Sequence, residues 1–160
     1  MTTFRYFAYG SNMLTKRLTG RCPSALVLGA VELSDFELRW HKVSKDGSGK
    51  CDITKAEGNK IYGVLYEIED GELSVLDKAE GVGAGYKREQ ISLDLNGETA
   101  AVTTYFATKT DASLKPYCWY KACVVEGAKE NGLPADYVKA LETVKCEEDT
   151  NRERDRKNRP

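Results

Sequence analysis

Two short segments of the sequence carry residue types that could do chemistry. The first is the tetrad Tyr-Gly-Ser-Asn at residues 9–12, which directly follows an apolar run at residues 4–8. A strand followed by glycine and two capping residues presents backbone amides at the start of the next helix, where an anionic group is bound well. The second segment, residues 76–82, contains Glu80, which a predicted helix places at its end. An anion cradle and a carboxylate together indicate an enzyme.

Length and charge exclude several other classes of protein. A chain of 160 residues fits one domain with a core that needs no metal or disulfide for support. Its 24 Lys and Arg residues nearly balance 25 Asp and Glu residues, so the overall charge attracts neither nucleic acid nor anionic lipid. Residues 1–5 do not resemble the start of a secretion signal, and no segment approaches the ~18 apolar residues of a membrane span. We therefore expect a cytoplasmic protein without a membrane partner.

The cysteine pattern argues against a metal site and against a disulfide framework. Five cysteines are present and no two form a Cys-x-x-Cys pair, so structural zinc is not expected. The odd number in a protein expected in the cytoplasm favours free thiols. The single histidine, His41, lies at the end of a strand pattern and is interpreted as a structural residue. We expect neither a metal ion nor any other cofactor.

The first half of the chain is predicted to be mainly sheet. A strand at residues 4–9 precedes a helix from Ser11 to Gly20, and residues 25–33 and 36–43 are predicted to form two paired strands. Residues 44–60 contain two groups of turn residues and are predicted to form a variable, mobile loop with one short strand at residues 51–54. Residues 61–68 are apolar on both faces, which predicts a central strand in which Gly63 needs a packing reason.

The second half of the chain alternates helix, hairpin and helices. A helix from Asp70 ends at Gly81, which is suited to a left-handed terminal residue. The pair Asn96-Gly97 predicts a two-residue hairpin turn between strands at residues 86–95 and 98–108. Two helices then begin near Pro116 and Pro134.

The last segment, residues 147–160, has no apolar residue. We interpret it as a disordered or fraying tail because it cannot bury enough surface to offset the entropy of ordering. The catalytic domain is thus predicted to cover residues 1–146. Because strands are grouped rather than alternating with helices, the pattern favours a single α+β domain. Its sheet is predicted to be mixed, mainly antiparallel and curling towards a barrel, with helices beside it.

Three separated motifs together resemble the γ-glutamylcyclotransferase family. Residues 7–13, Phe-Ala-Tyr-Gly-Ser-Asn-Met, resemble its N-terminal phosphate-loop-like turn, and residues 76–82, Leu-Asp-Lys-Ala-Glu-Gly-Val, resemble the end of its catalytic helix. Residues 127–134, Gly-Ala-Lys-Glu-Asn-Gly-Leu-Pro, are similar to a signature near its C-terminus. The resemblance covers about residues 4–145. Asn12 and the third motif favour the branch that acts on γ-glutamyl amino acids.

This resemblance implies a small α+β enzyme that releases 5-oxoproline and a free amine. In the family the α-amino group of the substrate attacks its own γ-carbonyl, so no protein nucleophile, metal or cofactor is required. Glu80 would be the general acid and base. The substrate-binding residues would be Tyr9, Gly10, Ser11, Asn12, Tyr105 and Tyr120. The partner would be a small γ-glutamyl molecule rather than a nucleic acid or a membrane, and a homodimer is a possible assembly.

Several alternatives remain open at this stage. The enzyme could act on γ-glutamylamines or on a glutathione-like peptide, although those branches resemble Tyr-Gly-Thr-Leu and Tyr-Gly-Ser-Leu at the first motif. A non-catalytic relative that only binds a small ligand is a further alternative, which Glu80 argues against. For single residues, Glu80 could be an ordinary exposed acid, and Tyr105 and Tyr120 could be core residues. The loop at residues 44–60 could alter substrate choice.

Overall fold

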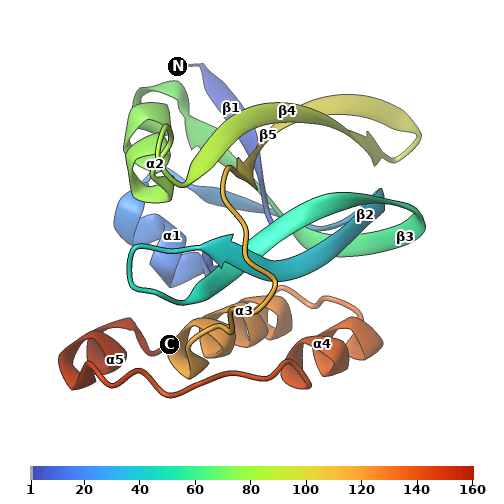
Figure 1. The fold of residues 1–160 in the computed structure, drawn as a ribbon. Helices are drawn as coiled ribbons and strands as arrows, with labels where there is room; N and C mark the ends of the chain where they lie inside the picture. The colour runs from blue at the N-terminus through green and yellow to red at the C-terminus, as the bar shows by residue number, and fades with distance from the viewer. Residues whose placement is uncertain (1) are drawn as a thin grey trace.

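A curved five-stranded sheet forms the centre of the computed structural model, which describes residues 2–160 (Figure 1). The strand order is β2-β3-β1-β5-β4; β1 and β5 are parallel, and the other neighbouring strands are antiparallel. The curled sheet stays open, which confirms the predicted α+β class with a mixed, mainly antiparallel sheet. The strands are β1 (Thr3–Ala8), β2 (Leu26–Val43), β3 (Gly49–Glu69), β4 (Tyr86–Leu95) and β5 (Glu98–Ala107).

Strands β2 and β3 are much longer than the sequence pattern predicts. The two predicted strands at residues 25–33 and 36–43 do not pair with each other, because they are consecutive halves of β2 and both pair with β3. Asp35 separates the halves with a φ of 64°, and its Oδ1 accepts a hydrogen bond from Gly58 N (3.0 Å). The turn residues at 57–59 (Glu-Gly-Asn) therefore form a bulge within β3. The prediction of a mobile loop at residues 44–60 is wrong, since only residues 44–48 lie outside strands.

The second half of β3 is the central strand that the sequence predicts. It pairs with β1 on one side and with β2 on the other. Gly63 in this strand has a clear packing reason. A Cβ atom there would lie 2.5 Å from the carbonyl oxygen of Ala8 and 2.7 Å from the ring of Phe7. The close approach of β1 to β3 depends on this glycine.

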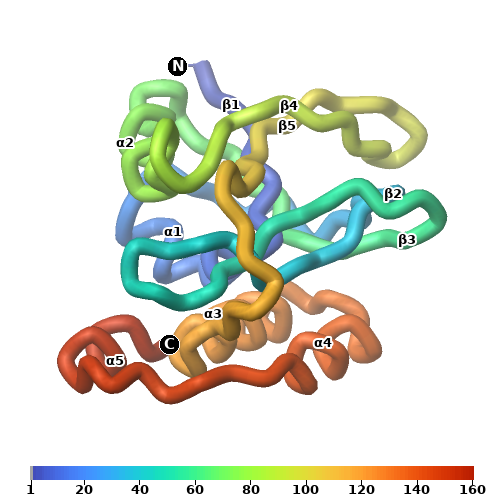
Figure 2. The backbone as a smooth tube through the Cα atoms, viewed as in Figure 1, coloured from blue at the N-terminus to red at the C-terminus, as the bar shows by residue number. Residues whose placement is uncertain are grey.

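The helices gather on one side and at one end of the sheet. In Figures 1 and 2, α3, α4 and α5 form a layer beneath the sheet, whereas α1 and α2 lie at its left-hand end. The predicted helix from Ser11 to Gly20 is broken at the extended residue Leu14. The helices are η1 (Ser11–Met13), α1 (Thr15–Arg21), η2 (Asp70–Glu72), α2 (Leu73–Glu80), α3 (Cys118–Glu130), α4 (Ala135–Glu142) and α5 (Arg152–Asn158).

Two local predictions from the sequence are confirmed. Gly81 ends α2 in the left-handed conformation, with a φ of 70°. Asn96 and Gly97, with φ values of 54° and 86°, form the turn of the β4–β5 hairpin. Positive φ at both central residues is what a type I′ turn requires.

The segment between β5 and α3 crosses from the sheet to the helical layer (Figure 2). It also stabilises the end of the β2–β3 hairpin, because Val43 N donates to Lys109 O and Gly49 N donates to Lys115 O, both at 2.9 Å. The turn at residues 44–48 is therefore held from the side by backbone hydrogen bonds. Its position matters because it borders the candidate site described below.

The C-terminal segment is ordered, contrary to the prediction of a disordered tail. Residues 152–158 form α5, which begins at Asn151, whose side chain accepts a hydrogen bond from Arg154 N (3.0 Å). Asp149 is only 4% exposed and accepts hydrogen bonds from Trp119 Nε1 (2.9 Å) and from Arg154. Counting apolar residues does not detect this anchor, because the buried group is a carboxylate. Its burial is tolerated since its hydrogen bonds are satisfied.

The cysteines also differ from the prediction of free thiols. Cys118 at the start of α3 forms a disulfide with Cys146, 28 residues later in the chain. The other three, Cys22, Cys51 and Cys123, are free and buried. The pair escaped the sequence argument because neither residue has a partner at a recognisable spacing. Within residues 2–160, no helix has the length and apolar character needed to cross a membrane.

Candidate active site

The residues singled out from the sequence come together around one cavity. It holds about 290 Å³ of empty space and lies where β1, η1, the end of α2, β3, β4, β5 and α3 meet. All seven sequence-predicted site residues are part of its wall. The full lining is Tyr6, Tyr9, Gly10, Ser11, Asn12, Cys51, Glu80, Tyr86, Tyr105 and Tyr120.

Glu80 is held in the cavity wall by Asn12. Its Oε1 accepts a hydrogen bond of 2.6 Å from Asn12 Nδ2, although 68 residues separate the two in the chain. The amide of Asn12 is itself fixed, because Nδ2 also lies 3.0 Å from the Tyr6 hydroxyl and Oδ1 accepts from Arg21 Nη1 (2.9 Å). The carboxylate of α2 is therefore oriented by the turn after β1.

The surroundings of Glu80 favour its protonated form more than water does. Burial raises the pKa of this carboxyl above its ordinary value. Three cations, Arg21, Lys50 and Lys42, and the hydrogen bond from Asn12 act in the opposite direction without cancelling the effect of burial. A carboxylate with a raised pKa is a better base for an ammonium group, and a larger fraction of it is protonated near neutral pH, where it can give its proton to a departing amine.

The turn after β1 packs closely against its neighbours. A Cβ atom at Gly10 would lie 3.1 Å from both Cys51 Cβ and the Tyr120 hydroxyl, so a larger residue would have to displace these neighbours slightly. Within the turn, the first backbone bond runs from Met13 N to Gly10 O (3.1 Å). The amides of residues 10–12 precede this bond, as expected for groups that can face an anion.

The third sequence motif supports this turn from below. A Cβ atom at Gly127 of α3 would clash with the backbone of Met13 and Leu14. Asn131 Nδ2 donates to Met13 O (2.8 Å) and to Gly127 O (2.8 Å). Residues 127–134 therefore do not line the cavity. They hold the residues that do.

Five tyrosines form most of the remaining wall, and their hydroxyl groups are used in hydrogen bonds. Tyr9 donates to Tyr105 O (2.6 Å), and Tyr105 donates to Asp77 Oδ1 (2.7 Å). Tyr86 donates to Cys51 O (2.6 Å), and the Tyr120 hydroxyl accepts from Cys51 N (3.0 Å). Burial raises the pKa of the Tyr9, Tyr86 and Tyr120 hydroxyls well above the ordinary value, so these groups keep their protons. Tyr105 and Tyr120 are thus both buried and part of the cavity.

Three lining residues, Tyr6, Cys51 and Tyr86, were not predicted. Tyr86 directly follows the glycine-rich run at residues 81–85, and its nearness in the chain to Glu80 is the signal that could have identified it. Tyr6 lies on β1 in the run before the turn, where an apolar pattern alone predicts a core residue. Cys51 carried no signal, because only the long-range pairing of β2 with β3 brings it to the cavity.

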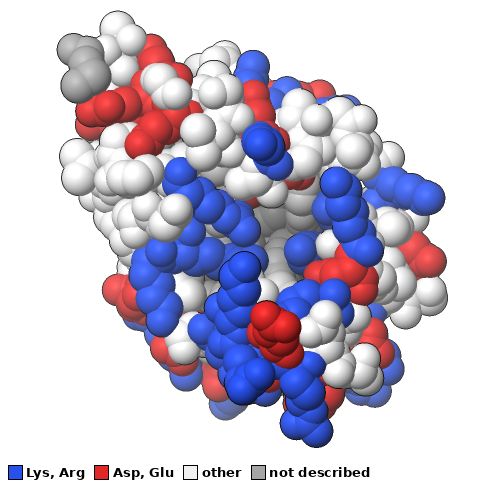
Figure 3. Space-filling model, turned by 90° about the vertical axis from the view of Figure 1, so that its left-hand side faces the viewer, with Lys and Arg blue, Asp and Glu red and all other residues white. Residues whose placement is uncertain are grey.

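Lys and Arg side chains surround the opening on the face that carries α1, α2 and the turn at residues 44–48 (Figure 3). The hollow at the centre of this face has blue side chains on several sides, although the whole chain is nearly neutral. The local charge therefore favours an anionic ligand, which the balanced overall composition did not reveal.

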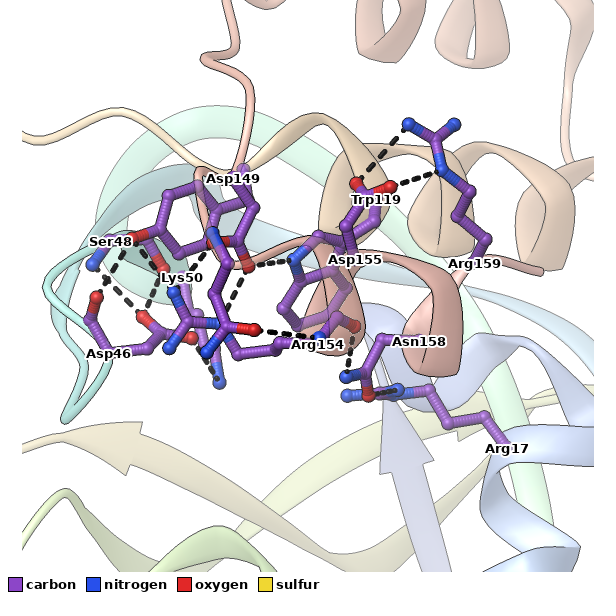
Figure 4. A network of polar contacts seen from close by, with 12 residues as sticks. Arg17, Asp46, Ser48, Lys50, Trp119, Asp149, Arg154, Asp155, Asn158 and Arg159 are labelled. Carbon is purple, nitrogen blue, oxygen red and sulfur yellow. Dashed lines mark hydrogen bonds and ion pairs between the residues drawn. The ribbon is translucent and has the colours of Figure 1, made fainter.

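Arg17 connects the site to the C-terminal helix (Figure 4). Its Nε donates to Ser11 Oγ (3.2 Å), and its Nη1 donates to Asn158 Oδ1 of α5 (3.1 Å). The guanidinium also lies 5.5 Å from the centre of the Trp119 ring, whose nitrogen donates to Asp149. The C-terminal segment is therefore a second support of the cavity wall.

The structure offers no cluster that would suit a metal ion. Among residues 2–160, no three His, Cys, Asp or Glu side chains come together as possible ligands. His41 instead makes a 2.7 Å contact with Asp52, whose other oxygen accepts from Ala107 N (2.9 Å). This supports its interpretation as a structural residue of the sheet.

Comparisons with known proteins identify the family. The model of the AIG2-like family matches residues 60–141. A γ-glutamylcyclotransferase from Bos taurus is 35% identical over 89% of this chain and 79% of its own length, and one from Mus musculus is 35% identical over 91% and 81%. A solved γ-glutamyl cyclotransferase structure superposes with a TM-score of 0.87 and 31% identity, covering 94% of this chain and 93% of the other. The chain belongs to the γ-glutamylcyclotransferase family of enzymes.

Proposed function

We propose that the protein converts a γ-glutamyl amino acid to 5-oxoproline and the free amino acid. The α-nitrogen of the substrate attacks its own γ-carbonyl carbon, which closes a five-membered lactam and breaks the bond to the departing nitrogen. The α-ammonium nitrogen loses one proton before the attack and a second as it becomes the lactam N–H. The departing nitrogen gains one proton as its bond breaks and a second as it becomes the ammonium group of the free amino acid. The reaction is a rearrangement of bonds within one molecule, so it needs no second substrate, oxidant or reductant.

In this proposal Glu80 carries proton transfers at both nitrogens. It first accepts the proton of the α-ammonium group and then gives it to the departing nitrogen. The observation that carries the proposal is a carboxyl group with a raised pKa in the wall of a small cavity, fixed by a hydrogen bond from Asn12. A carboxylate at its ordinary pKa of about 4.3 would be a poor base for an ammonium group.

The remaining cavity residues are assigned to binding and shape. The amides of residues 10–12 hold the α-carboxylate of the γ-glutamyl group or polarise the reacting carbonyl. Tyr9, Tyr105 and Tyr120 close the walls and favour the bent conformer in which nitrogen and carbonyl meet. The γ-glutamyl group is assigned to the cavity and the released group to its opening.

Two other cyclotransferase substrates are weighed against this choice. A γ-glutamylamine would place a neutral or cationic group at an opening surrounded by Lys and Arg, which is electrostatically unfavourable. A glutathione-like peptide carries the required negative charge but is larger than a dipeptide. The motif at residues 9–12 favours the γ-glutamyl amino acid. A binding protein without turnover is disfavoured by the raised pKa of Glu80.

The decisive experiment measures 5-oxoproline released from γ-glutamyl dipeptides, glutathione and γ-glutamyl-lysine by the wild type and by Glu80→Gln. We expect Glu80→Gln to lower kcat by about 10²–10⁴, because the amide keeps the shape but cannot accept the proton. Calorimetry should show that the variant still binds a γ-glutamyl dipeptide. A variant that keeps more than about a tenth of the wild-type kcat would refute the assignment of Glu80.

The setting of this activity is part of the proposal. We propose a cytoplasmic enzyme whose partner is a small γ-glutamyl molecule, with neither nucleic acid nor membrane surface involved. The near-balance of 24 basic and 25 acidic residues supports this. A homodimer is the assembly to test by light scattering. Fractionation of cells that carry the tagged protein tests the compartment.

A further inference from the structure

Lys42 has a largely buried side chain whose ammonium group makes no ion pair with any of residues 2–160. It is only 8% exposed, near the end of β2, and no ion pair or hydrogen bond from its ammonium group is present within residues 2–160. Its ammonium lies 4.6 Å from the centre of the Tyr86 ring. Burial lowers the pKa of Lys42, whereas the charges of Glu80 and Asp46 raise it. Within residues 2–160, the Tyr137 hydroxyl is the one fully enclosed side-chain polar atom without a partner, so the ammonium nitrogen of Lys42 still meets solvent and a ligand can reach it.

A second lysine stands directly opposite. Lys42 on β2 and Lys50 on β3 are register partners in the antiparallel pair, so their side chains share one face of the hairpin. Like charges in this arrangement destabilise a hairpin. Lys50 has one acidic neighbour, Asp46, whose Oδ2 lies 3.7 Å from its ammonium nitrogen, while Oδ1 accepts from Ser48 Oγ. Two adjacent cations with one shared acid leave positive charge free for a ligand.

Both lysines flank the candidate cavity. Tyr86, beneath Lys42, is part of its wall, and a Cβ atom at Gly85 would lie 2.9 Å from Lys42 Nζ. Lys50 lies 5.8 Å from the centre of the Tyr120 ring, also in the wall, and precedes the lining residue Cys51. Both charges act on Glu80. The pair therefore borders the site of proton transfer on the side of the β2–β3 hairpin.

We propose that Lys42 and Lys50 form a subsite for the carboxylate of the amino acid that is released. This inference rests on the proposed function and adds the part of the substrate that the cavity itself does not enclose. A γ-glutamyl amino acid has two carboxylates. The turn at residues 10–12 is assigned to the one on the γ-glutamyl group, and the two lysines take the other. The subsite selects amino acids over amines as the released group.

Lys42 differs from the other cations near the opening in having no polar side-chain partner among residues 2–160. Arg21 is occupied by Asn12 Oδ1, and Arg17 is occupied by Ser11 and Asn158. Both guanidinium groups therefore hold residues of the turn after β1 in place. Lys42 has no such contact, and Lys50 has only the shared Asp46. A ligand carboxylate between the two ammonium groups would remove their repulsion and complete the hydrogen bonds that the fold leaves unmade.

The test compares γ-glutamyl-alanine with γ-glutamyl-alaninamide, which differs only by the loss of the second carboxylate. We expect the wild type to prefer γ-glutamyl-alanine by about tenfold or more in kcat/KM, as for a hydrogen bond to a charged group. In Lys42→Met this preference should fall to about twofold or less, through KM. Because the charge of Lys42 also acts on Glu80, its loss affects turnover of both substrates, and the readout is the ratio of their kcat/KM values.

Two further variants complete the design. Lys45→Met removes an exposed lysine from the same hairpin and should leave the preference unchanged. Lys42→Arg keeps the positive charge and should keep most of the preference for γ-glutamyl-alanine. If Lys42→Met does not fold, Lys50→Met is measured in its place, and the wild-type preference remains a test by itself.

The outcomes are distinct. Equal kcat/KM values for the two substrates in the wild type would overturn the subsite while leaving the cyclotransferase activity intact. An equal loss on both substrates in Lys42→Met would also overturn it, because the lysine would then serve the γ-glutamyl group or Glu80. No 5-oxoproline from either substrate would overturn the proposed function and the subsite with it.

Discussion

At the scale of single residues, the site depends on one long-range contact between Asn12 and Glu80. The hydrogen bond of 2.6 Å joins a residue of η1 to the last residue of α2. Both residues were candidates from the sequence, which gave them separate roles. In the structure, Asn12 Oδ1 also accepts a hydrogen bond from Arg21 Nη1. One amide side chain therefore links a cation to the carboxyl group of Glu80. The side chain of Asn12 therefore orients Glu80, in addition to the substrate contact proposed for this residue.

The raised pKa of Glu80 has a consequence for stability. When the pKa of an acid is higher in the folded state, its stabilising contribution is complete below the unfolded value, about 4.3, and is lost as pH rises through the folded value. Glu80 should therefore destabilise the fold near neutral pH. Glu80→Gln has no such loss, so its unfolding free energy relative to wild type should increase between pH 4 and neutrality. Urea unfolding at several pH values measures this, and a constant or shrinking difference would contradict it.

At the scale of the elements, α5 reaches the site through a short chain of contacts (Figure 4). Asn158 contacts Arg17, which contacts Ser11 in the cavity wall. Asn158 is also held by its own helix, because its Nδ2 donates to Arg154 O (2.9 Å). The acceptor for Arg17 is therefore in a fixed place. The contribution of α5 to the site is indirect and concerns the position of the turn.

We expect Asn158→Ala to raise KM for a γ-glutamyl dipeptide by about two- to tenfold, the effect of one lost hydrogen bond, with kcat nearly unchanged. The reason is that Arg17 keeps its bond to Ser11 but loses the contact that fixes its direction. The matched control is Arg156→Ala, an exposed residue of the same helix, which should leave both constants unchanged. Steady-state kinetics separates the two variants. A fall in kcat with constant KM would contradict a positioning role.

At the scale of the whole molecule, a disulfide and a buried carboxylate hold the last part of the chain against the domain. The Cys118–Cys146 disulfide joins the start of α3 to the segment that follows α4. Asp149 then anchors the chain on Trp119 and Arg154. These contacts surround the N-terminal end of α3, whose other end supports the turn at residues 10–12 through Gly127 and Asn131. The C-terminal segment is thus part of the domain rather than an appendage.

The disulfide should contribute measurably to stability when it is formed. Closing a loop of this length lowers the entropy of the unfolded chain, which corresponds to about 3–4 kcal/mol. We expect Cys118→Ser to lower the unfolding free energy of the oxidised protein by that order. Dithiothreitol should destabilise the wild type and leave Cys118→Ser unaffected, and peptide mass spectrometry identifies the bond. Equal stability with and without reductant would show that the bond is not formed in solution.

Much of the local structure is predictable from the sequence because neighbouring residues decide it. Positive φ at Asn96 and Gly97 and the left-handed Gly81 are determined by the identity of the residues in the turn and at the helix end. The apolar pattern of residues 61–68 likewise identifies the central strand. The seven candidate residues of the site were found because three motifs, taken together, resemble one family, and the structure brings all seven to one cavity.

Only the tertiary structure decided the features that depend on distant contacts. The sequence could not show that residues 26–43 form one strand, because a bend at Asp35 looks like the end of a strand until β3 pairs with both halves. The order of residues 147–160 depends on a carboxylate buried against Trp119, which composition does not register. The positive opening is also hidden in a neutral chain, since charges separated in sequence gather only when the sheet curls. Local sequence determines turns and helix ends, whereas burial, charge and pKa at the site depend on which surfaces meet.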